Sequence, residues 1–340
     1  YVKEITCDGK KKYGSVYATS YKEVKVKQQL YILQPNKSHN PISITVSQLI
    51  DEWLSSIKNR VKPCTYQKYE SVCRHHIICE LGLTPVRFIS HFTIMNFAEK
   101  LSSKSISSKT VNDILIVLGL AFKYCEITYN ITSPKINYIK VERKEMRVFS
   151  VQEQQILTNY LLHDIDIHKF GILLALFTGM RVGELCALKW EDITERQIIV
   201  NKTMMRIKND NGKTEVKIGP PKSECSNRII PTPKCLFPLI NRFRNTGYVL
   251  SNNKLLFTEP RLMQLKFDKM ITECNLEKAN FHTLRHTFAT RCVEAEVDIK
   301  TLSELLGHAD VKTTLNRYVH SSMELKRMNM EKLNLSPSIF

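Results

Sequence analysis

The stretch 281–320 constrains the fold most, because it combines three sets of helix start and stop signals with a dense group of polar residues. We expect a helix capped by Thr283, a second capped by Asp298 and ended by Gly307, and a third started by Asp310. Three short helices with sharp corners can direct their polar side chains toward one point. This part of the chain is therefore predicted to build a compact site.

The polar residues of this stretch suit a phosphate. The guanidinium of Arg285 can grip two non-bridging oxygens, the imidazole of His282 can donate a hydrogen bond or move a proton, and the phenol of Tyr318 can attack phosphorus. Taken singly, each residue also fits a plainer role as a surface cation, a core histidine or a half-buried aromatic. A metal pair at His282 and His286 is a third interpretation, but zinc proteases need Glu where Thr283 stands.

Composition points to a polyanionic partner. The 340 residues include 50 Lys and Arg against 33 Asp and Glu, a net charge of +17, which is typical of nucleic-acid binding. The length predicts two or three domains. No apolar run reaches the roughly 18 residues of a membrane helix, and no signal peptide opens the chain. Ten cysteines without a C-x-x-C pair indicate reduced thiols of a cytoplasmic protein.

The segment 41–130 has the apolar spacing of four or five short helices, the pattern of an independent helical domain. Helices are expected to start near Thr45, at a Thr65 cap and at Thr93, and a last one to span 110–124. The basic side chains of this segment form either an ordinary solvated face or a DNA-facing surface, and the net charge favours DNA. The candidate contacts are Lys58, Arg60, Lys62, Lys68, Arg74, Lys104 and Lys109.

Two basic segments flank this domain. Residues 1–40 hold eight lysines against three acids, with a short strand expected at 16–18 and a helix at 21–33. They are either a solvated tail or the end of a small DNA-binding module. Residues 131–148 lack a sustained apolar period and are predicted to be an extended basic linker, whose candidate DNA contacts are Lys140, Arg143, Lys144 and Arg147.

A second domain is predicted to start at Phe149, where Ser150 and Glu153 form a capping box. The strongly apolar helix 169–178 should be buried, and it ends in a Thr-Gly corner that leads directly to Arg181, with Glu184 three residues later. Runs at 198–207 and 214–218 are β-rich and are separated by the turn signal Asn211-Gly212. Lys222 follows, at or near the tip of a hairpin, where a lysine is ordinarily just an exposed turn residue.

In this order the motifs resemble those of the tyrosine recombinases, the phage-integrase-like enzymes that include integrases of conjugative transposons. The family order is Arg, Lys, His-x-x-Arg, His or Trp, and Tyr. The matching residues here are Arg181, Lys222, His282, Arg285, His308 and Tyr318. The resemblance covers about 45–320, with 41–130 similar to a core-site-binding domain and 149–322 to the catalytic domain. Residues 1–40 are similar, more weakly, to the end of an arm-type domain.

This resemblance implies a fold class and a chemistry. The fold would be mainly α with a small β-sheet, with the helical and catalytic domains forming a clamp around DNA. Tyr318 would make a 3′-phosphotyrosine and free a 5′-hydroxyl, while Arg181 and Arg285 hold the non-bridging oxygens. Lys222 would protonate the leaving 5′-oxygen, and His282 would assist proton movement near Tyr318. His308 would add a hydrogen bond to the phosphate, and Glu184 would support Arg181.

Neither a metal nor another cofactor is expected, since side chains supply the positive charge. The expected partners are double-stranded DNA and further copies of the chain, as a dimer at each site and a tetramer in synapsis, with accessory directionality or DNA-bending proteins. The tail 323–340 has irregular apolar spacing and is predicted either to fray or to dock in trans on the next subunit. The enzyme would integrate and excise a mobile DNA element in the cytoplasm, at the bacterial nucleoid.

Two other functions remain compatible with the sequence. One is a type IB topoisomerase-like enzyme, which uses the same chemistry without a partner duplex. The other is a catalytically silent DNA-binding regulator. Plasmid relaxation set beside two-site recombination separates all three functions.

Overall fold

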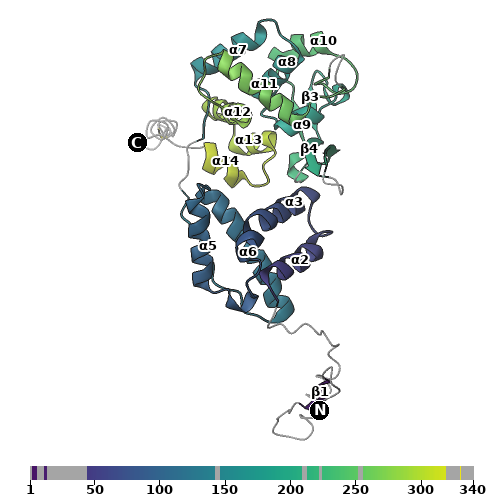
Figure 1. Ribbon diagram of the computed structural model, residues 1–340. Helices are drawn as coiled ribbons and strands as arrows, with labels where there is room; N and C mark the ends of the chain where they lie inside the picture. Colours follow the sequence, from purple (N-terminus) through teal and green to yellow (C-terminus); the bar gives the residue numbers. More distant parts are fainter. Residues whose placement is uncertain are drawn as a thin grey trace, which may run out of the picture. The chain divides into compact units, whose positions relative to one another are not determined.

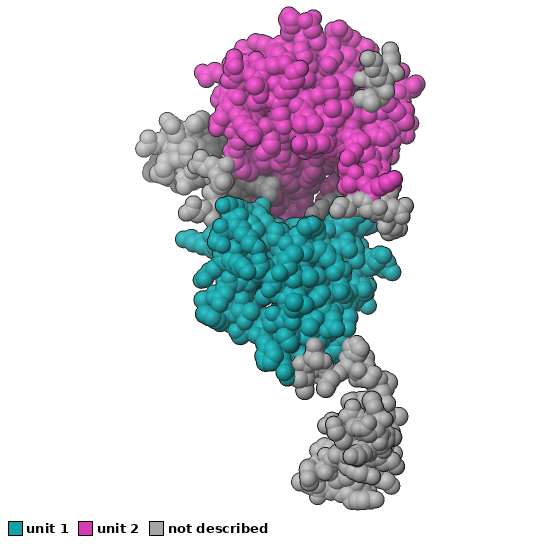
Figure 2. Space-filling model, viewed as in Figure 1, with its two compact units in different colours: residues 1–142 teal, residues 143–340 magenta. Residues whose placement is uncertain are grey.

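The computed structural model describes residues 2–5, 11–13, 44–141, 146–208, 213–221, 224–251, 256–318 and 330. The chain divides into two compact units, 1–142 and 143–340, which Figure 2 shows in different colours. Near the N-terminus, β1 (Val2–Ile5) pairs antiparallel with β2 (Lys11–Tyr13). The strand and helix expected at 16–18 and 21–33 lie outside the described residues, as does the tail apart from Met330.

The first unit is helical (Figure 1). Its helices are α2 (Val46–Ile57), α3 (Pro63–Val72), α4 (Ile78–Leu81), α5 (His91–Ser103) and α6 (Ser108–Tyr129), with a π-helical turn at Cys73–Ile77 and a 3-10 turn at Val86–Phe88. Thr45 caps α2 through a capping box with Gln48, and Ser90 caps α5. Apolar faces of these helices meet in one core, in which Leu49, Ile114 and Phe122 are almost fully buried.

The cap predicted at Thr65 was wrong. Helix α3 begins two residues earlier, at Pro63, where the missing N–H of proline costs no helical hydrogen bond. Thr65 donates its backbone N–H to the carbonyl of Lys62 and so lies inside the first turn. The sequence Thr-x-x-Lys there lacks the acidic partner of a capping box, so proline decides the start.

The stretch 131–141 is extended and packs on the first unit. Ile131, Ile136 and Ile139 contact its core. The side chain of Asn112 on α6 pairs with both backbone groups of Ile139, at 2.8 Å each. The part of the predicted linker that the structure describes before Met146 is therefore anchored to α6.

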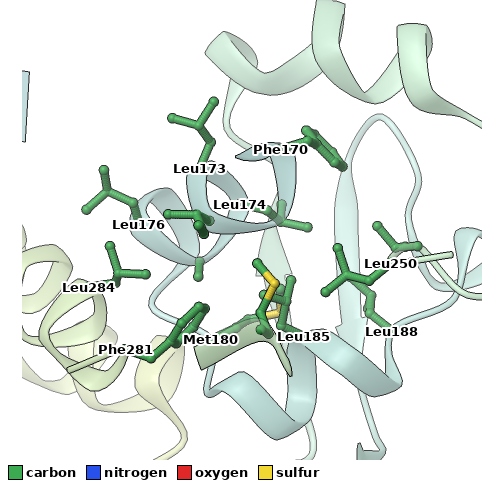
Figure 3. Close-up of a cluster of buried hydrophobic side chains, with 14 of the residues drawn as sticks. Phe170, Leu173, Leu174, Leu176, Met180, Leu185, Leu188, Leu250, Phe281 and Leu284 are labelled. Carbon is green, nitrogen blue, oxygen red and sulfur yellow. The ribbon is translucent and has the colours of Figure 1, made fainter. Parts of the chain in front are cut away.

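The second unit is built around helix α8 (Ile167–Thr178), which is buried on all sides as its apolar sequence predicts. Figure 3 shows Phe170, Leu173 and Leu174 of this helix among side chains from later parts of the chain, including Leu185, Leu250 and Leu284. Helix α7 (Val151–Leu162) precedes it and has the predicted capping box of Ser150 and Glu153. Full burial of a large apolar side chain, such as those of α8, stabilises the fold by about 1.5–3 kcal/mol. Helix α8 therefore anchors the elements that carry the site.

Among the residues of this unit that the structure describes, four strands form two antiparallel pairs. Strand β4 (Thr203–Lys208) pairs with β5 (Thr214–Gly219), from Thr203 opposite Gly219 to Lys208 opposite Thr214. Strand β3 (Gln197–Val200) pairs with β6 (Arg228–Pro231). Lys222 lies outside the described residues, in the connection from β5 to β6. The prediction of a hairpin formed by the strands on either side of Lys222 was wrong, because β5 pairs with β4 and β6 pairs with β3.

The remaining helices cover this framework. They are α9 (Val182–Ala187), α10 (Phe237–Phe243), α11 (Pro260–Glu273), α12 (His282–Glu294), α13 (Ile299–Leu306) and α14 (Val311–Tyr318), with 3-10 turns at Trp190–Asp192, Glu224–Ser226 and Lys234–Leu236. The fold class predicted from the sequence, mainly α with a small β component, is confirmed. Within the described residues, no helix is both long and apolar enough to cross a membrane.

The three helices predicted for 281–320 are α12, α13 and α14. Asp298 caps α13, and Gly307 ends it in the left-handed conformation, both as expected. The cap predicted at Thr283 was wrong, because α12 begins one residue earlier and Thr283 is buried inside it. Phe281 occupies the N-cap position without a side-chain bond, and Asn280 before it supplies the acceptors: its side-chain oxygen accepts from the backbone N–H of His282, and its carbonyl accepts from that of Thr283.

Candidate active site

The corner after α8 positions Arg181. Gly179 ends the helix with φ of +65°, and a Cβ there would come within 2.5 Å of Phe288, so neither the backbone nor the space admits a side chain. Met180 then turns into the core, and Arg181 stands at the start of α9 with its side chain partly exposed. The Thr-Gly corner thus places a guanidinium at the end of a rigid buried helix.

Glu184 holds that guanidinium in place. Its carboxylate is 2 % exposed and accepts from the Arg181 Nη1 at 2.6 Å and from the Arg181 backbone N–H at 3.0 Å. Arg181 Nη2 also donates to the Gly307 carbonyl at 3.3 Å. Burial raises the pKa of Glu184, but the hydrogen bond from Arg228 and the charges of Arg228 and Arg181 outweigh it and leave this pKa below its usual range. The carboxylate is therefore ionised and engaged by two arginines.

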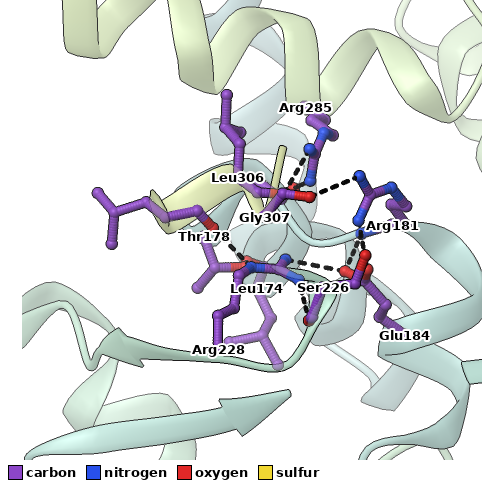
Figure 4. Close-up of polar contacts among 11 residues, drawn as sticks. Leu174, Thr178, Arg181, Glu184, Ser226, Arg228, Arg285, Leu306 and Gly307 are labelled. Carbon is purple, nitrogen blue, oxygen red and sulfur yellow. Dashed lines mark hydrogen bonds and ion pairs between the residues drawn. The ribbon is translucent and has the colours of Figure 1, made fainter. Parts of the chain in front are cut away.

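Arg285, on α12, is 1 % exposed and has two carbonyl partners in the described structure. Its Nη1 donates to Gly179 at 2.8 Å and its Nη2 to Leu306 at 2.5 Å, at the C-terminal ends of α8 and α13 (Figure 4). Such helix ends carry partial negative charge. Burial, followed by the charges of Arg181 and Arg228, lowers the pKa of Arg285 to about 9. A guanidinium remains charged at neutral pH, so the protein holds this charge at a cost that a bound anion would relieve.

A third arginine, Arg228, was not singled out from the sequence. It opens β6, and its Nη2 contacts the second oxygen of Glu184 at 2.8 Å. Its Nε donates to the Leu305 carbonyl at 2.6 Å and its Nη1 to that of Ser226 at 3.2 Å. In the sequence it is only an arginine before two isoleucines, and nothing local separates it from a surface residue at a strand end.

Arg228 should matter most for stability. Arg228→Met leaves the buried Glu184 carboxylate with only one of its two arginine partners, and breaking a buried ion pair lowers the free energy of unfolding by about 3–5 kcal/mol. We expect a correspondingly lower urea midpoint. The control is Arg206→Met on β4, whose pair with Glu259 has the same 2.8 Å separation but is about half exposed on the arginine side. That change should cost under about 1 kcal/mol. Equal losses in the two variants would contradict a buried structural role for Arg228.

Tyr318 lies at the end of α14 and is 7 % exposed. It belongs to a small buried cluster with Ala289, Leu302 and Leu306. Its hydroxyl is 2.7 Å from Nδ1 of His286, one residue after Arg285. Because the carbonyl of Leu306 accepts from Arg285 and Leu306 shares this cluster with Tyr318, the tyrosine lies beside the arginines. The contact with His286 could not be read from the sequence, where this residue figured only as half of a metal pair.

The other two histidines of the predicted site, His282 and His308, lie at the start of α12 and directly after α13. His282 is exposed at the start of α12, and its ring meets that of His286 edge to face with centroids 4.7 Å apart. His308 follows Gly307, and its Nδ1 is 2.8 Å from the hydroxyl of Thr314, which is fully buried. Gly307 is required there, because a Cβ would come within 2.9 Å of the Cys225 carbonyl and 3.1 Å of Arg228. Within the described residues, no three metal-ligating side chains cluster.

The structure thus joins Arg181, Glu184 and Arg228 in one hydrogen-bonded cluster. Arg181 and Arg285 donate to the adjacent carbonyls of Gly307 and Leu306, and Tyr318 lies beside them. Two of the guanidiniums pair with the one carboxylate and the third, that of Arg285, donates to backbone carbonyls, so these described side chains carry an excess of two positive charges. His308 is joined to the cluster through the Gly307 corner. Chemically, the arrangement fits an anion with a phenol held beside it.

The predicted DNA-contacting side chains of the first unit are exposed: Lys58, Arg60, Lys62, Lys68, Arg74, Lys104, Lys109 and Lys140. Lys68 pairs with Asp113, Arg74 with Asp51, and Lys104 with Glu80. Exposed pairs of this kind stabilise by about 0–1 kcal/mol, so phosphates can replace the carboxylates. These side chains are available to a polyanion.

The basic residues near the start of the second unit differ. Arg147 is partly buried, pairs with Glu153 and Glu277, and donates to the Val148 carbonyl. Its charge is already matched, so it contributes to the entrance of α7 more than to an open basic surface. Arg143 and Lys144 lie outside the described residues.

The family described as "Phage integrase family" matches residues 146–324, and "Phage integrase, N-terminal SAM-like domain" matches residues 45–102. A relative named "Tyrosine recombinase XerC-like", from Caldanaerobacter subterraneus subsp. tengcongensis, is 28 % identical over 94 % of this chain and 90 % of its own length.

Two solved structures show the same fold. The Tn1549 transposon integrase in complex with a circular intermediate DNA matches with a TM-score of 0.76 at 22 % identity, over 86 % of this chain and 100 % of that one. A lambda integrase tetramer bound to a Holliday junction matches with a TM-score of 0.63 at 18 % identity, over 94 % of both chains.

Proposed function

Because this chain belongs to the phage integrase family and is a tyrosine recombinase, we propose that it joins Tyr318 covalently to a scissile phosphate of duplex DNA and then rejoins the strands. One observation carries the assignment of residues. Arg181 and Arg228 share the carboxylate of Glu184, at 2.6 and 2.8 Å, and Arg285 donates to backbone carbonyls nearby, beside a buried tyrosine. A phosphodiester supplies the negative charge that this cluster lacks.

The proposed reaction is a pair of transesterifications. The Tyr318 oxygen attacks phosphorus, a 3′-phosphotyrosine bond forms, and the bond to the 5′-oxygen breaks. Arg181 and Arg285 bind the non-bridging oxygens, where negative charge grows in the transition state, and preorganised donors of this kind are usually the largest catalytic contribution. Lys222 gives the leaving 5′-oxygen its proton. The phosphotyrosine conserves the energy of the broken bond, so rejoining needs no nucleotide.

His282 and His308 complete the proposed set. His308, on the Gly307 corner beside the Arg181 contact, donates to a phosphate oxygen. His282, at the exposed start of α12, assists proton movement near Tyr318. Glu184 and Arg228 do not touch the DNA in this proposal and hold Arg181 in place.

The DNA contacts proposed for the two units are phosphate contacts. The exposed lysines and arginines of the first unit supply most of them, Lys140, Arg143 and Lys144 continue them, and Arg147 is the weakest candidate because two carboxylates match it. Such contacts position the duplex and make affinity steeply salt-dependent. Duplex DNA held by both units would be the clamp that the sequence suggests.

We further propose that the substrate is the end of a mobile element, integrated and excised at the nucleoid. The similar Tn1549 integrase is a transposon enzyme, and the similar lambda integrase assembles as a tetramer on a Holliday junction. A dimer at each site and a tetramer in synapsis are proposed on that likeness, together with accessory directionality or DNA-bending proteins. Residues 323–340, proposed to dock in trans, lie outside the described residues apart from Met330.

Two assays run side by side test this function. A recombinase should join two plasmids that carry the element's paired end sites and relax a single supercoiled plasmid poorly. Efficient relaxation without joining would instead favour a topoisomerase-like enzyme. Binding without either product would favour a regulator.

Cleavage should also survive metal removal. The positive charge at the proposed phosphate site comes from Arg181 and Arg285, with Lys222 as the acid, so no ion is needed for charge stabilisation. Adduct formation on a nicked DNA substrate should be unchanged within about twofold in excess EDTA. Complete loss in EDTA, with recovery on added zinc or magnesium, would instead support the metal pair at His282 and His286.

A further inference from the structure

We propose that His286 is the base that receives the Tyr318 proton during strand cleavage and returns it during rejoining. This assignment rests on the proposed function and adds a catalytic residue outside the six that the sequence motifs supply. It is carried by a direct contact: the imidazole Nδ1 lies 2.7 Å from the hydroxyl oxygen that would attack phosphorus.

The fold holds the two groups together from separate helices. His286 is on α12 and Tyr318 ends α14. Ala289, three residues after His286 and so on the same side of α12, is fully buried and packs with Tyr318. Tyr318 is fixed further by Leu302 and Leu306 of α13. The tyrosine is therefore confined on one side by apolar contacts, with its hydroxyl at the imidazole.

The orientation of the imidazole is also restrained. The ring of His282 lies edge to face against the His286 ring, with an interplanar angle of 84°. The ring of Tyr318 also contacts the His286 ring, with 5.8 Å between the two centroids. His286 is half-buried and His282 is exposed. Of the two histidines, His286 therefore has the direct contact and the fixed geometry that a base requires, and His282 packs behind it.

Each atom of the step is accounted for. With its ring proton on Nε2, the imidazole accepts the Tyr318 hydroxyl at Nδ1. As the oxygen–phosphorus bond forms, the hydroxyl proton moves to Nδ1, and the 5′-oxygen leaves with a proton from Lys222. In rejoining, the 5′-hydroxyl returns its proton to the neutral Lys222 as it attacks phosphorus, and Tyr318 leaves as a phenol with the proton that His286 held. Arg285, the neighbour of His286 on α12, lies close enough for Tyr318 to influence its pKa, which favours negative charge on the phenol oxygen.

The same contact has an opposite interpretation: a latch that keeps the tyrosine away from DNA. A latch and a base predict opposite changes in the cleavage rate when His286 is replaced. Removing a latch speeds cleavage, whereas removing a base slows it.

Two substitutions at His286 decide between them. His286→Asn keeps a side-chain amide near the position of Nδ1 that can accept a hydrogen bond but not a proton, and His286→Ala removes both abilities. Each protein is mixed with a nicked DNA carrying the natural site, and the rate of covalent adduct formation is measured under single-turnover conditions. Duplex binding and thermal unfolding are followed in parallel, to establish that both variants fold and bind.

The expected result is a loss of about a hundredfold or more in the adduct rate of both variants, with binding within twofold of the parent. Added imidazole should restore part of the rate to His286→Ala but none to His286→Asn, whose side chain fills the site. A DNA with a 5′-bridging phosphorothiolate, which leaves without a proton, should rescue Lys222→Ala but neither His286 variant. That contrast separates a base from the acid.

Three results would overturn the proposal: a parent-like rate in His286→Asn, a faster rate in either variant, or rescue of both by the phosphorothiolate. The first result would show that His286 only positions Tyr318, and the second that it acts as a latch. The third would show that it contributes to the general-acid step of Lys222. Failure of the wider function looks different, because the parent itself would then form no adduct or Tyr318→Phe would still form one.

Discussion

Replacing Tyr318 with phenylalanine should abolish covalent protein–DNA adducts while leaving DNA binding and folding nearly intact. The substitution removes the only atom proposed to bond phosphorus, so no residual route to the phosphotyrosine exists. The ring remains to pack on Ala289, Leu302 and Leu306, and the lost hydroxyl contact with His286 costs about 1 kcal/mol. A nicked substrate that traps the adduct, followed on a denaturing gel, measures the effect directly.

Tyr160→Phe is a matched control for this variant. Tyr160 lies on α7 in the same unit, and its hydroxyl also has a side-chain partner, Glu273. Its loss should leave adduct formation at the parent level. Adducts that persist in Tyr318→Phe would remove Tyr318 from the nucleophile position and, with it, the assignment of residues around it.

The local signals of the sequence predicted much of the framework, because helix ends are decided by a few neighbouring residues. Ser150 with Glu153, Asp298, and the glycines at 179 and 307 all act as the sequence indicates. The failures at Thr65 and Thr283 are of one kind. In each case a competing residue nearby, Pro63 or Asn280, set the helix start instead.

The interior of the site was less predictable, because its contacts join residues far apart in the chain. Arg228 reaches Glu184 across 44 residues, and His286 reaches Tyr318 across 32. No local period or spacing announces such a pair. The family motifs supplied the residues proposed to face the phosphate, whereas the residues that support them emerged only when α8, α13 and β6 were assembled around one point.

The second large effect is expected from Arg285→Ala. This guanidinium contributes two donors at the proposed phosphate site, and loss of one such donor in a transition-state site costs about a hundred- to a thousandfold in rate. We expect adduct formation to fall by about a thousandfold. Folding should also weaken, because the carbonyls of Gly179 and Leu306 lose their bonds to Nη1 and Nη2. Arg285→Lys should recover little, since one ammonium cannot replace a planar fork that bridges two helix ends.

A control for the stability component lies six residues along the same helix. Arg291 also donates to a distant backbone carbonyl, that of Phe149, and to Gln154, but it belongs to no phosphate site in this proposal. Arg291→Ala should therefore lower the unfolding midpoint and keep the adduct rate within a few-fold. The two variants are compared at a temperature where both are folded, by single-turnover cleavage. If Arg285→Ala then cleaves DNA at the same rate as Arg291→Ala, the buried guanidinium of Arg285 stabilises the fold only. The arginine cluster would then not be a phosphate-binding site.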